Sequence, residues 1–148
     1  MIRRHKYGLD QSMGRALAEC LGERLPLAGG QYDLVVPVPL HPKRLRWRGF
    51  NQAALLAAEV ARRLECELDA TSLVRVVATP PQTANDLETR RRNVRHAFAV
   101  RRAARVASRR VLLVDDVMTT GATANECART LRAAGARSVD VFTLARVL

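Results

Sequence analysis

One run of the chain, residues 111–123, constrains the fold more than any other. Its first four residues are aliphatic, the next two are the acids Asp115 and Asp116, and the run ends in threonines around a glycine. A continuous aliphatic run is typical of a buried parallel strand. A helix is predicted at 122–134, with Gly135 where helices often end. The run therefore predicts a strand, a sharp turn and a helix in an open α/β sheet, whose ligands bind at the carboxyl ends of the strands.

The predicted turn has the composition of an anion-binding site. Backbone N–H groups, threonine hydroxyls and the positive end of a helix dipole together favour phosphate. Gly121 lets the backbone come close to a ligand. The acids Asp115 and Asp116 repel phosphate and instead suit sugar hydroxyls or a divalent cation. The predicted ligand is therefore a sugar phosphate, of which a ribose 5-phosphate is one.

Simpler interpretations explain less of the run. Thr119 or Thr120 could cap the helix, and Asp115 and Asp116 could be solvated acids at a strand end. These roles account for each residue singly but not for their order. The chain has neither the G-x-x-x-x-G-K-[ST] pattern of a P-loop nor the G-x-G-x-x-G pattern of a dinucleotide fold. A phosphoacceptor receiver domain is excluded too, because its acid pair follows the first strand, whereas here most of the chain precedes the pair.

Residues 111–123 resemble the phosphoribosyl pyrophosphate signature of the type I phosphoribosyltransferases. Residues 33–44 and 46–52 are similar to the ComF family, also called GntX, and the resemblance extends from about Arg3 to Leu148. Further positions that fit this family's pattern are Gln82, Arg91, Asn93, Val94 and Phe98. The resemblance implies a single domain over residues 1–148 with the type I phosphoribosyltransferase fold, a mostly parallel twisted sheet flanked by helices. It also implies a glycosyltransferase, more narrowly a pentosyltransferase.

The resemblance assigns a role to each part of the expected site. Asp115 and Asp116 are the expected catalytic pair, holding the ribose hydroxyls and, directly or indirectly, Mg²⁺. The residues expected to bind the ribose and its 5-phosphate are Asp115, Asp116, Thr119, Thr120, Gly121, Ala122 and Thr123. The residues expected to bind pyrophosphate are Pro39, Leu40, His41, Lys43 and Arg44. The hypoxanthine–guanine branch carries an acid where Thr119 stands here, so the resemblance does not extend to purine salvage, and the acceptor is not identified.

A mobile loop that closes over the site is expected at 78–93, where Gln82, Arg90 and Arg91 could reach the pyrophosphate or the incoming group. Closure would exclude water from the reacting centre. For each of these residues taken singly, an exposed basic loop with no role in binding is an equally good explanation. Residues 39–49 are predicted to be a loop as well, and a solvated basic loop is the alternative to a pyrophosphate site there. His41 by itself could donate to phosphate or act as an acid–base group, although a lone histidine in a loop more often does neither.

The charge of the chain favours anionic partners. The net charge is +11, with 23 Arg, 2 Lys and 14 acids. A codon bias explains arginine over lysine but not the excess over acids. ComF relatives are associated with DNA uptake during natural transformation, so single-stranded DNA is the alternative partner. Residues 101–110, with five arginines, are predicted to be an exposed turn region, and Trp47 is the candidate for base stacking, although aromatic residues are scarce.

The remaining patterns bound the protein further. No secretory segment and no apolar run long enough to span a bilayer is present, so we expect a cytoplasmic protein with no membrane insertion. A homodimer is compatible with the sequence. ComF proteins commonly carry an N-terminal zinc finger, which the given sequence lacks, and its three cysteines form no C-x-x-C pair. Helices are predicted at 12–24 and 51–64, some helix near 86–92, and strands at 33–38, 72–77, 97–100 and 138–144.

Overall fold

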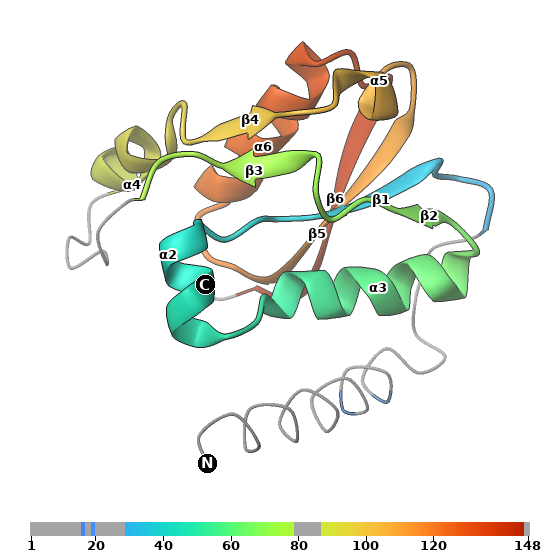
Figure 1. Cartoon of the computed structure of the whole chain (residues 1–148), viewed down its shortest axis with the longest axis horizontal. Helices are drawn as coiled ribbons and strands as arrows, with labels where there is room; N and C mark the ends of the chain where they lie inside the picture. Colours follow the sequence, from blue (N-terminus) through green and yellow to red (C-terminus); the bar gives the residue numbers. More distant parts are fainter. Residues whose placement is uncertain (1–15, 17–18, 20–28, 79–86, 147–148) are drawn as a thin grey trace.

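A four-stranded parallel sheet is the centre of the computed structural model, which describes residues 16, 19, 29–78 and 87–146 (Figure 1). The strand order is β2–β1–β5–β6. These strands are β1 (Leu34–Pro37), β2 (Glu67–Leu68), β5 (Arg110–Met118) and β6 (Ser138–Arg146). A separate antiparallel pair consists of β3 (Leu73–Arg75) and β4 (Phe98–Val100). The predicted α/β class with a mostly parallel sheet is confirmed.

Helices cover both faces of the sheet. The helix α3 (Gln52–Leu64) packs on one face, while α6 (Ala122–Ala133) and the β3–β4 pair cover the other (Figure 1). Side chains of β5 alternate between the two resulting cores, as the period of a strand requires: Val111 and Leu113 belong to the α6 side, and their neighbours to the α3 side. The shorter helices are α2 (Pro42–Arg48), α4 (Leu87–Val94) and α5 (Ala103–Val106).

Most predicted elements are present within two residues of their predicted bounds. The helices predicted at 51–64 and 122–134 are α3 and α6, and the strands predicted at 33–38, 97–100 and 138–144 are β1, β4 and β6. The predicted strand at 72–77 is the shorter β3, and the helix predicted near 86–92 is α4. The two-residue strand β2 was not predicted. Of the helix predicted at 12–24, only Ala16 and Glu19 are described, both helical; residues 79–86 also lie outside the described part.

The prediction that residues 39–49 form a loop is wrong, because α2 occupies most of that segment. His41 caps the helix, its Nδ1 accepting a hydrogen bond of 3.2 Å from the N–H of Lys43. Pro42 is its first residue, a position that proline favours. Gly49 ends the helix with φ 83°, in the left-handed region. Capping signals at both ends outweigh the basic, proline-containing composition that suggested a loop.

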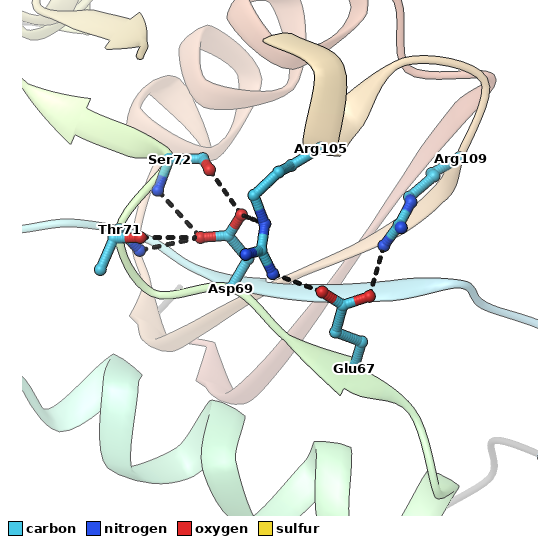
Figure 2. Close-up of polar contacts among 6 residues, drawn as sticks. All are labelled: Glu67, Asp69, Thr71, Ser72, Arg105 and Arg109. Atoms are coloured by element: carbon cyan, nitrogen blue, oxygen red, sulfur yellow. Dashed lines mark hydrogen bonds and ion pairs between the residues drawn. The ribbon is translucent and has the colours of Figure 1, made fainter. Parts of the chain in front are cut away.

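The prediction that residues 101–110 form an exposed turn region is confirmed only in part, because residues 101–104, 107 and 108 are exposed but the rest are not. The segment contains α5, and three of its arginines are engaged by acids from distant parts of the chain. Arg110 donates two hydrogen bonds of 3.0 Å to the carboxylate of Asp33. Arg105 and Arg109 both pair with Glu67 on β2, the latter at 2.6 Å (Figure 2). Much of the positive charge of this segment is therefore neutralised within the fold.

Asp69 is the buried centre of this ion-pair cluster (Figure 2). Its side chain accepts hydrogen bonds from the backbone N–H groups of Thr71 and Ser72, at 3.0 and 2.9 Å, and from both hydroxyls. The Nε of Arg105 lies 2.9 Å from Oδ2, although it is not in line for a hydrogen bond. The backbone N–H of Asp69 in turn donates to the carbonyl of Val35. The cluster therefore fastens α5 and the turn before β3 to the β2 edge of the sheet.

Candidate functional site

The junction of β5 and α6 forms a small polar cavity at the carboxyl end of the sheet. Its volume is about 50 Å³, and one water needs about 10–15 Å³, so it accommodates a small polyatomic group. Asp115 and every residue from Val117 to Ala124 line it. We call residues 119–123 the cradle. All five predicted phosphate-binding residues are therefore brought together around one cavity.

The cradle has backbone donors available for a ligand. Gly121 is the N-cap of α6, with φ 80°, and has no side chain with which to cap the helix. The first N–H groups of a helix have no partner within the helix. Thr120 Oγ1 accepts from the N–H of Ala122, at 3.3 Å. The remaining donors of the first turn and the helix dipole make the cradle suited to an anion.

The acids were expected at the end of a strand. They instead lie within β5, before the cradle. Asp115 lies opposite Thr143 of β6, so the strand pair continues past both acids. The backbone N–H of Asp116 donates to Asp115 Oδ1 at 2.9 Å, and that of Val117 donates to Asp116 Oδ1 at the same distance. Both carboxylates are thus held by neighbouring backbone groups on a paired strand.

The environment of Asp115 favours its neutral form. Burial, followed by the adjoining Asp116 carboxyl, raises the pKa of Asp115 to about 7. A cation, or the hydroxyl groups of a sugar, would stabilise the ionised form of Asp115. Within the described ranges, no group of three or more His, Cys, Asp and Glu side chains could hold a metal ion. Two carboxylates do not complete a metal site, so a cation at the acid pair would need oxygens of a ligand as well.

The predicted pyrophosphate segment lies at the same edge of the sheet. It follows β1, which is parallel to β5 and adjacent to it, with Pro37 opposite Val114. Lys43 and Arg44 are exposed on α2 and make no ion pair with any residue that the structure describes. Pro39 and Leu40 are half-buried before the helix. One nitrogen of His41 is committed to capping α2, a structural role that was not foreseen.

The described part of the predicted mobile loop faces a second hollow. Gln82 and the side chain of Arg90 lie outside the described residues. Arg91 is exposed on α4 and lines a groove of about 430 Å³ between α4 and α6. The full lining of this α4–α6 groove is Arg91, Val94, Arg95, His96, Ala122, Asn125, Glu126 and Arg129. The last four occupy one face of α6 at positions i, i+3, i+4 and i+7, a spacing that is visible in the sequence, whereas the wall on α4 is distant in the chain.

Comparisons with known proteins extend these observations. The model of the phosphoribosyl transferase domain matches residues 51–148. The DNA utilization protein YhgH of Escherichia coli K12 is 40% identical over 116 residues, which cover 78% of this chain and 50% of that protein. Competence protein F of Haemophilus influenzae is 35% identical over 152 residues, covering 99% of this chain and 66% of the relative. The chain thus spans about half the length of the first relative and 66% of the second.

Solved structures show the same fold. The glutamine phosphoribosylpyrophosphate amidotransferase of Bacillus subtilis has a TM-score of 0.58 at 22% identity, covering 90% of this chain and 26% of that chain. Adenine phosphoribosyltransferase of Saccharomyces cerevisiae has a TM-score of 0.53 at 17% identity, covering 95% and 69%. No helix among the described residues has the length and apolar character needed to cross a membrane. The chain belongs to the phosphoribosyl transferase domain family, as a relative of the ComF competence proteins.

Proposed function

We propose that this protein binds phosphoribosyl pyrophosphate together with Mg²⁺ and transfers the phosphoribosyl group to an acceptor. The observation that carries the proposal is the placement of two acids beside a small phosphate-sized cradle at the start of α6. The ligand has a phosphate at one end and vicinal hydroxyls nearby, so it matches both halves of the site. The family of the chain supports the same ligand class.

Each part of the site has a definite task in this proposal. The cradle seats the 5-phosphate, and Asp115 and Asp116 hold the ribose hydroxyls or the ion. Lys43 and Arg44 offer cationic groups for the pyrophosphate. The acceptor's lone pair forms a bond to the anomeric carbon as the bond to pyrophosphate breaks, and pyrophosphate leaves with the bonding electrons while the acceptor's proton is released. When bound, Mg²⁺ offsets charge on the leaving group.

Thermal unfolding with and without ligand tests this proposal. Saturation at about 100 Kd contributes about 2.7 kcal/mol, which corresponds to a rise in Tm of about 5–10 °C for a domain of this size. The double variant Asp115→Asn with Asp116→Asn should lose the rise. The control Glu65→Gln with Asp140→Asn changes the net charge equally at exposed positions outside the cradle and should keep it. No rise in the wild-type protein at saturating ligand would refute the proposal.

A second candidate function is the binding of single-stranded DNA. The relatives' names, DNA utilization protein and competence protein, point in this direction. Trp47 is 76% exposed on α2, next to the exposed Arg46. An exposed aromatic ring among cations can stack on a base while the cations contact phosphates. Because Arg105, Arg109 and Arg110 are engaged by acids, α2 is a better candidate for this contact than residues 101–110.

Titration of a fluorescently labelled oligothymidylate at several salt concentrations tests this candidate. Affinity should fall steeply with salt, and Trp47→Ala should weaken it by about 1–3 kcal/mol. The exposed residue Val76, on the segment after β3, provides the control Val76→Ala, which should leave the affinity unchanged. Salt-insensitive binding, or no binding at low salt, would exclude the function.

A further inference from the structure

The α4–α6 groove is large enough for a small-molecule group. Its volume of about 430 Å³ lies within the range of about 300–1,000 Å³ that is usual for ligand pockets. One wall comes from α4 and the turn that follows it, and the other from the first turns of α6. Ala122 lines both this groove and the cavity of the cradle, so the two adjoin.

The charge in the groove is positive and partly uncompensated. Three arginines line it against a single acid, Glu126. Arg129 pairs with Glu126 at 2.5 Å. Arg91 and Arg95 are exposed and make no ion pair or side-chain hydrogen bond with the described residues. Two guanidinium groups therefore remain available to an anion, and a guanidinium binds phosphate oxygens through two parallel donors.

The backbone at the mouth of the groove is held in an uncommon conformation. His96 has φ 60°, in the left-handed region that residues other than glycine rarely adopt. Its N–H donates to Glu126 Oε1 at 3.0 Å, and Glu126 is itself fixed by Arg129. The acid in the groove is thus occupied in holding the turn after α4 against α6. The same conformation occurs at Glu65 and Ser108, which also follow helices, so at His96 it belongs to the turn that ends α4.

We propose that the α4–α6 groove is a second phosphate-binding site, which takes a polyphosphate group. The guanidinium groups of Arg91 and Arg95 bind its oxygens, and the side-chain amide of Asn125 supplies a further donor. Two kinds of ligand could supply this polyphosphate group. One is free polyphosphate. The other is a ribose 5-diphosphate ester, whose first phosphate lies in the adjoining cradle and whose second phosphate continues into the groove. The second source rests on the proposed function of the cradle, whereas the groove itself does not.

Isothermal titration with inorganic tripolyphosphate tests the site. The variant Arg91→Gln with Arg95→Gln should bind at least about tenfold more weakly than the wild-type protein, because two charge-assisted contacts are lost. The matched control is Arg101→Gln with Arg102→Gln, which removes two exposed arginines outside the groove and should change affinity by less than about twofold. Equal losses in both variants, or no binding to the wild-type protein, would overturn the proposal.

Two further ligands separate the sources of the phosphate. If the groove continues the cradle, ADP-ribose should bind more tightly than ribose 5-phosphate, and Arg91→Gln with Arg95→Gln should remove that preference. If the source is free polyphosphate, ADP-ribose and ribose 5-phosphate should bind with similar affinity, while the variant should still weaken tripolyphosphate binding. The variant Asp115→Asn with Asp116→Asn should leave tripolyphosphate binding intact in either case. If tripolyphosphate binds but phosphoribosyl pyrophosphate does not, the result would therefore count against the proposed function and not against the groove.

Discussion

Removing the carboxylate of Asp69 should destabilise the whole domain. Asp69 is 2% exposed and Ser72 is fully buried, so water cannot replace the hydrogen bonds between them. Asp69→Ala leaves the hydroxyl and N–H of Ser72 without an acceptor, at about 1–3 kcal/mol for each buried group. It also deprives Arg105 of one partner, but this side chain is 38% exposed and keeps its pair with Glu67, so that loss adds at most about 1 kcal/mol. Because these costs overlap, we expect a total of about 3–5 kcal/mol, a third or more of a typical free energy of unfolding.

Urea unfolding followed by circular dichroism measures this loss. Fluorescence is less suitable, because the single tryptophan, Trp47, is already mostly exposed in the folded protein. The midpoint should fall by about 2 M for Asp69→Ala and by about half as much for Asp69→Asn, which keeps one acceptor oxygen. The control is Glu88→Gln, whose side chain is 72% exposed and pairs with Arg92; it should cost at most about 0.5 kcal/mol.

The pH dependence gives an independent check on the same residue. Burial alone would raise the pKa of Asp69, but hydrogen bonds from Ser72 and Thr71 and the charge of Arg105 outweigh it and leave the pKa below its ordinary value. The folded state therefore binds this proton less readily than the unfolded chain. The stabilisation is present above the ordinary carboxyl pKa and is lost as the pH falls through the lowered one. A loss below about 1 kcal/mol for Asp69→Ala at pH 7, or a cost for Asp69→Asn that does not shrink in acid, would refute this account.

Three further predictions concern the site and the cysteines. The folded state raises the pKa of Asp115 to about 7, so the stabilising contribution of this residue is present in acid and is lost as the pH rises through 7. Asp115→Asn should therefore increase the free energy of unfolding at pH 8 by about 1–2 kcal/mol. Urea unfolding measures this gain, and its absence would count against the prediction. Gly121→Ala places a Cβ in ordinary contact, 3.7 Å from the nearest atom, so its cost should come only from the left-handed backbone, with φ 80°. We expect a cost of about 1–2 kcal/mol, which lowers the Tm by several degrees. A larger loss would indicate a clash. Burial raises the pKa of the Cys127 thiol, so Cys127→Ser should not change the number of thiols that Ellman's reagent labels in the native protein, and a decrease would show that this cysteine is accessible.

Patterns that repeat over many residues allowed most of the fold to be predicted. The aliphatic run at the start of β5 and the amphipathic period of α3 each average over several side chains that face one core. The helix α2 was missed because its evidence is confined to its two ends, the His41 cap and Gly49. The strand β2 has only two residues and no period at all.

The site was predictable where its residues are consecutive and was not where they are distant. The cradle and the acids form one run of sequence, so they could be named together. The partners of the arginines in 101–110 could not, because Glu67 is 42 residues from Arg109 and Asp33 is 77 from Arg110. Long-range pairing of this kind depends on the order of the strands. The same limit applies to the α4–α6 groove, whose two walls are about 30 residues apart, as the bond between His96 and Glu126 shows.

The position of the acids within β5 has a consequence for how the protein opens. The residues that precede them, from Val111 to Val114, are buried in both hydrophobic cores, and the acids continue the same hydrogen-bonded strand pair. Elements at the centre of a sheet exchange their amide hydrogens only in global unfolding, whereas loops open locally. Beyond Val114, β5 is paired with β6 alone, so the acid pair depends on that one strand pairing. We therefore expect the acid pair to stay in place in partly unfolded forms as long as the β5–β6 pairing is kept.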